Sequence, residues 1–249
     1  MSATSALAAA TGPYEVFKNC PLSNPEVVAC TYATTTSGEF IVGNKTVPIK
    51  HTVTLQGGLA TENGTTFTFV APTNGTEILS KTPQTVPGGL IGIEGLGGEV
   101  TATAELAGPA SSVSLQPINL VSASGTALTL PVKLKLGNPF LGNHCYAGSN
   151  AHPIVINLTT GTTSPPPPNK PISGKPGTVE EEEGIVTLNN NTLANNSFAA
   201  PGVEGCGLIP FLVDPVVDLV LGVPAGEGHN TAVLNGALKV VPAELVRNH

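Results

Sequence analysis

The 249-residue chain has few charged side chains. Asp, Glu, Lys and Arg together make up 11% of it, where soluble domains typically have about 25%. Hydrophobic residues make up 40%, so the composition excludes the disorder that follows from high net charge and low hydrophobicity. The net charge is −7, with 10 Lys and Arg against 17 Asp and Glu. Because a nucleic-acid-binding surface needs clustered cations, we expect no nucleic-acid partner.

The sequence also lacks tryptophan and long apolar runs. No stretch approaches the ~20 unbroken apolar residues of a membrane-spanning helix, so we expect no transmembrane segment. Tyr14, Tyr32 and Tyr146 are scattered, and few flat aromatic side chains are therefore available to stack against a sugar.

Four cysteines, Cys20, Cys30, Cys145 and Cys206, are the candidate disulfide residues. Four cysteines allow three pairings, and the sequence does not decide between them. Turn-forming residues flank both members of the pairs Cys20–Cys30 and Cys145–Cys206, which favours this pairing. The even cysteine count, the low Lys and Glu content and the Thr- and Asn-rich segments are typical of an oxidising compartment. We therefore expect a secreted, extracellular protein.

Residues 1–12 are rich in Ala, Ser and Thr. Ala6–Ala8 and Ala8–Ala10 fit the small-x-small pattern of a signal-peptidase site, but no basic start and no long apolar stretch stand before them. We interpret this segment either as the remnant of a signal peptide or as a disordered tail.

Several segments alternate between apolar and polar residues, as half-buried strands do. Residues 99–106 place Val100, Ala102, Ala104 and Leu106 on one face, and residues 128–136 place five apolar residues on one face. Pro131 and two lysines on the other face of 128–136 predict an edge strand, because proline cannot donate to the ladder. Shorter strands are expected at 27–35, 39–42, 51–55, 66–71, 153–158, 184–188 and 231–241.

Residues 113–121 alternate as well, but the phase changes at Pro117, which predicts a β-bulge. Turn dipeptides such as Asn63–Gly64 separate most of the strands. The whole pattern predicts a mainly all-β fold, an antiparallel β-sandwich or jelly-roll-like double sheet with one or two short C-terminal helices.

The expected helices lie near the C-terminus. Asp214 and Pro215 predict the start of the first helix and Gly222 its end, and a second is expected at 242–248. The apolar run 208–221 is too short to cross a bilayer, so we expect it to form a buried plug at one end of the sandwich.

We expect one domain over residues 13–249. Residues 159–183 interrupt the strand pattern with four consecutive prolines and the acidic run Glu180–Glu183. This Pro/Glu-rich excursion is either a linker between halves or an ordered loop. A single domain is favoured because Cys206 has no cysteine partner within 184–249.

No motif predicts a catalytic residue, a metal ligand or a cofactor site. Gly-x-Ser-x-Gly and Cys-x-x-Cys are absent, and the glycine-rich stretch 88–98 contains no Gly-x-Gly-x-x-Gly. The glutamates at 99, 105 and 180–183 are expected to be solvated. The cluster 144–146, His-Cys-Tyr, is the most suggestive, but a disulfide at Cys145 would prevent this residue from acting as a nucleophile.

Six stretches together resemble a known group of sequences. They are 17–21 (FKNCP), 53–58 (VTLQGG), 130–141 (LPVKLKLGNPFL), 158–165 (LTTGTTSP), 168–174 (PNKPISG) and 211–215 (FLVDP). The chain after about residue 13 resembles a family of uncharacterised secreted proteins predicted from soil actinobacteria. The resemblance implies a complete signal peptide upstream and an extracellular location. It implies no activity and no site residue.

Three functions are compatible with these observations. The first is a non-enzymatic structural or interaction protein of the cell surface or matrix, with a cell-envelope or extracellular partner. The second is an extracellular binding module for a small apolar or glycan ligand, with a cavity lined from residues 88–98 and 208–221. The third is a glycan-acting hydrolase with acids that only the fold brings together. An apolar pocket would favour the second function, a filled core the first, and two carboxylates about 5–10 Å apart in a cleft the third.

Overall fold

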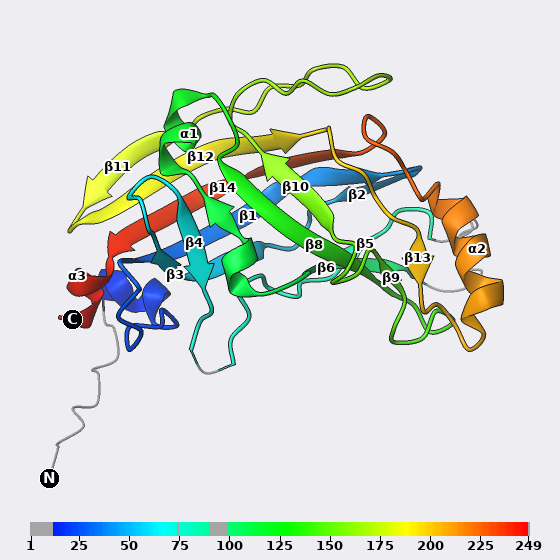
Figure 1. Cartoon of the computed structure of the whole chain (residues 1–249), viewed down its shortest axis with the longest axis horizontal. Helices are drawn as coiled ribbons and strands as arrows, with labels where there is room; N and C mark the ends of the chain where they lie inside the picture. The colour runs from blue at the N-terminus through cyan, green and yellow to red at the C-terminus, as the bar shows by residue number, and fades with distance from the viewer. Residues whose placement is uncertain (1–11, 74, 90–98, 249) are drawn as a thin grey trace, which may run out of the picture.

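The computed structural model describes residues 12–73, 75–89 and 99–248. Fourteen strands in this part of the chain form one antiparallel sheet, with short helices at its ends (Figure 1). The predicted mainly all-β, antiparallel and sandwich-like fold with short C-terminal helices is therefore confirmed. The strands are β1 (Ala29–Val42), β2 (Lys45–Pro48), β3 (Val53–Ala60), β4 (Phe67–Val70), β5 (Gln84–Thr85), β6 (Thr101–Leu106), β7 (Ser114–Leu115), β8 (Leu128–Gly137), β9 (Tyr146–Ala147), β10 (Ile154–Leu158), β11 (Thr178–Glu182), β12 (Ile185–Asn195), β13 (Val203–Glu204) and β14 (Thr231–Pro242). The helical elements are η1 (Gly12–Phe17), η2 (Ala110–Ser112), α1 (Pro117–Ser122), α2 (Pro210–Leu221) and α3 (Ala243–Arg247).

The sheet folds over so that its two halves face each other across the main core. The strand order is β11-β12-β14-β1-β3-β4-β7-β8-β6-β5, and β10 pairs with β8. In Figure 1, β8 and β10 lie in front of β14 and β1, and one hydrophobic cluster contains buried residues of both layers, among them Leu130 of β8 and Leu234 of β14. The short strands β4 and β7 connect the layers on one side.

Two further contacts join the layers elsewhere. Thr159, directly after β10, forms an isolated β-bridge with Ala194 of β12. The side chain of Gln84 in β5 accepts hydrogen bonds from the backbone N–H groups of Lys50 and His51, which follow β2. The folded sheet therefore encloses its core from several sides.

The expectation that residues 128–136 form an edge strand is wrong. β8 has neighbours on both sides, with β10 on one and first β7, then β6 on the other. Pro131 lies where β8 changes from β7 to β6, after the pairing of Thr129 and before that of Val132. The missing N–H of a proline is tolerated at such an interruption of the ladder.

Residues 117–121 form a helix rather than a continuation of strand β7 after a bulge. Pro117 is the first residue of α1, a position that suits proline because the N–H there has no partner within the helix. The left-handed Ala123 ends α1. Thr160 Oγ1 donates a hydrogen bond to the carbonyl of Asn119, which fixes this turn against the segment after β10.

Helix α2 begins earlier than expected, at Pro210 instead of after Asp214. Pro215 lies inside the helix, and the left-handed Gly222 ends it as predicted. Asp214 is not an N-cap residue, because its carboxylate accepts hydrogen bonds from the N–H groups of Gly205 and Cys206. None of the helices in the described ranges is both long and apolar enough to span a membrane.

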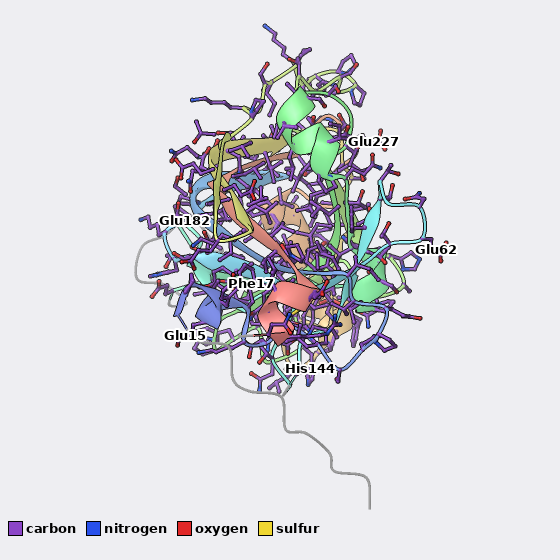
Figure 2. All side chains as sticks on the ribbon, turned by 90° about the vertical axis from the view of Figure 1, so that its left-hand side faces the viewer. Glu15, Phe17, Glu62, His144, Glu182 and Glu227 are labelled. Atoms are coloured by element: carbon purple, nitrogen blue, oxygen red, sulfur yellow. A yellow bond between two sulfur atoms is a disulfide. The ribbon has the colours of Figure 1, made fainter. Side chains whose placement is uncertain are left out.

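The two disulfides join Cys20 to Cys30 and Cys145 to Cys206, the pairing that the flanking turn residues favour. Cys20–Cys30 belongs to a second, smaller core between the N-terminal segment and α3. Phe17 is almost fully buried in this core and lies beside α3 (Figure 2). The two ends of the described chain therefore pack against the same side of the sheet.

The Pro/Glu-rich excursion is an ordered segment that pairs both with itself and with β12. Thr162 bridges to Ser173, and Lys175 bridges to Thr192 of β12. The excursion ends in β11, which pairs with β12 and carries three exposed glutamates. Of the residues expected to be a tail or signal remnant, 1–11 lie outside the described part of the chain.

Candidate ligand cavity

A cavity of about 130 Å³ lies inside the folded sheet. Strands of both layers line it, with residues from β1, β3, β6, β8, β12 and β14 among others, and α2 contributes its last residue, Leu221. Most of the lining side chains are aliphatic. For scale, an engineered cavity of roughly 150 Å³ lined by Leu, Ile and Phe stays free of water and binds benzene.

Small side chains at inward positions leave this space unfilled. Ala33 of β1 and Ala102 and Ala104 of β6 pack against the main core but retain accessible surface, and all three line the cavity. Ala237 of β14 lines it as well. Well-packed interiors contain few voids larger than a water molecule, so a space bounded by alanine side chains from two strands, β1 and β6, is a distinct feature of this core.

The backbone at one wall of the cavity excludes a larger side chain. Gly236 of β14 pairs with Thr35 of β1 on one side and with Asn191 of β12 on the other. A Cβ atom at Gly236 would collide with the carbonyl oxygen of Thr34. Both neighbouring strands have a register shift at this place, between Thr35 and Ser37 and between Leu188 and Asn191, and such bulges increase the local bend of a sheet.

Several polar groups of the lining are occupied by hydrogen bonds within the chain. Ser80 Oγ accepts from the N–H of Thr54 and lies 2.9 Å from Thr82 Oγ1. Gln84 Oε1 accepts two backbone N–H groups, and its Nε2 donates to the carbonyl of His51. Lys45, the one charged side chain among the described lining residues, donates from Nζ to the carbonyl of Gly89. The wall therefore favours a ligand that needs no hydrogen bonds.

The cavity has a different lining from the one expected. Of the run 208–221, only Leu221 lines it, because most apolar residues of this run are exposed to solvent. Of the stretch 88–98, residues 90–98 lie outside the described part of the chain. The sequence places Ala102 and Ala104 on the inward face of a strand, but it carries no signal that distant alanines such as Ala33 face the same space.

The described carboxylates do not converge in the cavity, since no Asp or Glu is among the described lining residues. Figure 2 shows Glu15, Glu62, Glu182 and Glu227 at separate places on the periphery. Glu99, expected to be solvated, accepts a hydrogen bond from Thr85 at the surface. Over the described ranges, no three His, Cys, Asp or Glu side chains are grouped as a metal site would require.

The sequence cluster 144–146 separates into parts with different surroundings. Cys145 is fully buried in its disulfide, so it is not available as a nucleophile. Tyr146 donates a hydrogen bond to Glu105 Oε2 at 3.4 Å, and Lys133 Nζ lies 5.0 Å from the centre of the tyrosine ring. Partial burial of the hydroxyl, and next the nearby Glu105 carboxylate, raise the pKa of Tyr146 above its ordinary value.

An ion pair between Lys81 and Glu77 lies near Tyr146 and Glu105. Lys81 Nζ lies 2.6 Å from Glu77 Oε1, and this hydrogen bond raises the pKa of Lys81. Both partners are about half exposed, and exposed pairs of this kind contribute little to stability. None of these residues, Glu77, Lys81, Glu105, Lys133 and Tyr146, lines the cavity.

A second hollow lies at the surface beside the end of α2. Its lining is mostly backbone and small residues, and it includes the exposed His229. The Gly43–Asn44 turn between β1 and β2 forms one side, where the N–H of Asn44 donates to the carbonyl of Leu221. The hollow is more open than the cavity and brings no set of acid and base groups together, so the apolar cavity inside the sheet is the better candidate site.

No protein-family model matches the chain, and comparisons with curated proteins and with solved structures also find no match. The resemblance to secreted actinobacterial proteins therefore stays a prediction.

Proposed function

We propose that the protein is an extracellular binding module that holds a small apolar molecule inside its folded sheet. The observation that carries this proposal is the aliphatic cavity of about 130 Å³. Transfer of an apolar molecule from water into such a space is favourable in proportion to the apolar area removed from water. Because several polar groups of the wall are already hydrogen-bonded within the chain, the wall favours apolar ligands over glycans, whose hydroxyl groups need several hydrogen-bond partners.

The cavity volume limits the ligand to about the size of a monocyclic aromatic or a short hydrocarbon. Very small ligands gain at most about 1.5 kcal/mol for each non-hydrogen atom. At about half of this ceiling, roughly 0.6–0.8 kcal/mol for each of its seven carbon atoms, toluene should bind with a dissociation constant on the order of 0.1–1 mM.

The test uses toluene as the probe and two matched variants. Ala104→Leu fills the cavity with a larger side chain, whereas Ala199→Leu makes the same chemical change at an exposed loop position. In methyl NMR spectra of the intact protein, toluene should shift the resonances of Ala33 and Ala104. The affinity should fall at least tenfold in Ala104→Leu and stay unchanged in Ala199→Leu.

Two results would refute the proposal. One is a wild-type protein in which saturating toluene moves no cavity methyl resonance. The other is equal toluene binding by the wild type and a folded Ala104→Leu variant, because this would place the ligand outside the cavity. A soluble glucose oligomer serves as the polar comparison, and we expect no cavity shifts with it.

The extracellular location is part of the same proposal and is supported by the two disulfides. Disulfides persist mainly in oxidising compartments. Expression of the protein in its native host, followed by fractionation and thiol labelling, tests it. Recovery of the protein from the cytoplasm with labelled cysteines would contradict an extracellular location.

A structural or interaction role is the second candidate. The observation in its favour is the large exposed apolar surface of α2.

A further inference from the structure

Helix α2 presents an apolar surface to solvent at one end of the molecule (Figure 1). The most exposed side chains are Leu208 at 100%, Leu219 at 80% and Phe211 at 77%. Phe140 is 73% exposed, and it lies near the start of α2 because the N–H of Gly207 donates to the carbonyl of the adjacent Leu141. We call this surface the α2 face; it consists of Phe140, Leu208, Ile209, Phe211, Leu212, Val216 and Leu219.

The polarity of α2 is the reverse of that of an ordinary surface helix. Such a helix buries apolar residues and exposes charged ones. In α2, Asp218 accepts a hydrogen bond from the N–H of Val203, and Asp214 accepts two from residues 205 and 206. Both acids therefore bind the protein backbone, while only Val217 and Leu221 of the helix are buried. No other segment of the described chain covers these outward-facing apolar residues.

Four residues of the α2 face follow the spacing of a helix–helix seam. Ile209, Leu212, Val216 and Leu219 are separated by three, four and three residues. This alternation places side chains in one stripe that interlocks with a similar stripe on a second helix. The α2 face therefore has the pattern of a surface that packs against another helix.

The charges around the α2 face favour a second copy of this chain over a lipid surface. Residues 176–238 contain no Lys or Arg, and membrane-binding helices commonly use such cations to hold anionic lipids. In a two-fold symmetric contact, by contrast, each surface meets its own copy, so a charged surface would repel itself. The exposed residues of the α2 face are uncharged, and backbone N–H groups bind the carboxylates of both acids of α2, Asp214 and Asp218, so these acids are held away from a partner surface.

The area is also sufficient for a stable dimer. With the exposed fractions above and roughly 150–200 Å² for a large apolar side chain, the α2 face exposes on the order of 800 Å². This is about the area that each partner buries in an interface of standard size. Monomeric proteins rarely leave a continuous apolar patch of this size exposed.

We propose that the protein forms a two-fold symmetric homodimer in which the α2 faces of two copies pack against each other. The helices would run antiparallel about the two-fold axis, so that Phe140 at the start of one α2 meets the end of the other. This dimer is independent of the proposed ligand, because the α2 face lies outside the cavity.

Sedimentation of the full chain over a concentration series tests the proposal. We expect a species with twice the 25.1 kDa mass of one chain and a dissociation constant in the micromolar range or tighter. Val216→Glu should raise this constant at least 100-fold, because it buries a charge opposite its own copy. Val179→Glu is the matched control, since Val179 of β11 and Val216 are both 56% exposed and the change in charge is identical. The control should stay within about threefold of the wild type.

A cysteine variant tests the geometry separately. The described chain has no free thiol, so Val216→Cys introduces a single reactive one. Under mild oxidation it should form a covalent dimer, and Val179→Cys should not.

Three outcomes would overturn the proposal. The first is a wild type that stays monomeric throughout the series. The second is a dimer that Val216→Glu leaves intact or that Val179→Glu disrupts equally. The third is a monomer that floats with phosphatidylcholine vesicles and loses this binding in Val216→Glu, which would assign the α2 face to lipid.

Discussion

Replacement of Asn230 by alanine tests how the end of the folded sheet next to α2 is held together. The Asn230 side chain is fully buried. Its Oδ1 accepts the N–H of Gly43, in the turn between β1 and β2, at 3.0 Å. Its Nδ2 donates to the carbonyl of Phe198 at 2.8 Å and lies 3.2 Å from the carbonyl oxygen of Gly226. One side chain therefore joins three segments that are far apart in the sequence.

The expected loss of stability follows from these contacts. Asn230→Ala removes the partner of the partly buried Gly43 N–H and of the buried Phe198 carbonyl. An unsatisfied buried polar group costs about 1–3 kcal/mol, and entry of water into the vacated space would recover part of this. Gly43 has little freedom to adjust, because the backbone of residues 221 and 222 lies directly against its Cα. We therefore expect the free energy of unfolding to fall by ~3 kcal/mol.

Urea unfolding measures this change, with Asn143→Ala as the control for loss of an exposed asparagine. The midpoint should fall strongly for Asn230→Ala at an unchanged slope, and the thermal midpoint should fall by about 6–12 °C. The control should stay within ~0.5 kcal/mol of the wild type. A value for Asn230→Ala as small as that of Asn143→Ala, at equal slope, would refute the reasoning.

The remaining predictions concern the Cys145–Cys206 disulfide and Tyr146. The disulfide closes a loop of 61 residues, so the double variant Cys145→Ser/Cys206→Ser should lose about 4 kcal/mol of unfolding free energy in urea. A loss below ~1 kcal/mol would contradict this. In a separate experiment, the intact protein unfolded without reductant should take up no thiol reagent. The raised pKa of Tyr146 means that the folded state holds the hydroxyl proton more tightly than the unfolded state. The contribution of this proton to the free energy of unfolding is therefore complete below the ordinary tyrosine pKa near 10. It is lost as the pH rises through the higher folded-state pKa. In an NMR titration of the tyrosine ring, Glu105→Gln should lower the pKa of Tyr146 toward its ordinary value, and an unchanged or higher pKa would exclude the carboxylate as a cause.

Local patterns were sufficient to predict the fold class. Alternating residues in 99–106 and 128–136 identified two strands and their inward faces, because a strand turns successive side chains to opposite sides. Gly222 marked the end of α2, since a left-handed residue there favours glycine. These signals depend on a few neighbouring residues, and the tertiary structure did not change them.

The predictions were wrong where the role of a residue depends on segments that are distant in the sequence. Pro131 indicates an edge only if its strand keeps one pair of neighbours, and β8 instead changes partner beside it. Asp214 looks like an N-cap residue in the sequence, but the N–H groups of residues 205 and 206 bind its carboxylate. The apolar run 208–221 predicts burial by composition, yet its acids bind the backbone and most of its apolar side chains face outward.

For this protein the sequence by itself determined the strand faces, the turns and the antiparallel β class, because these follow from the period of side chains along the backbone. Only the tertiary structure decided that the sheet folds over on itself and that Ala33 of β1 and Ala104 of β6 line the same cavity. The physical reason is that a cavity is the volume left between side chains from strands far apart in the chain, and a pattern of neighbouring residues cannot predict that volume. The outward direction of the α2 face depends in the same way on contacts that Asp214 and Asp218 make with another part of the chain.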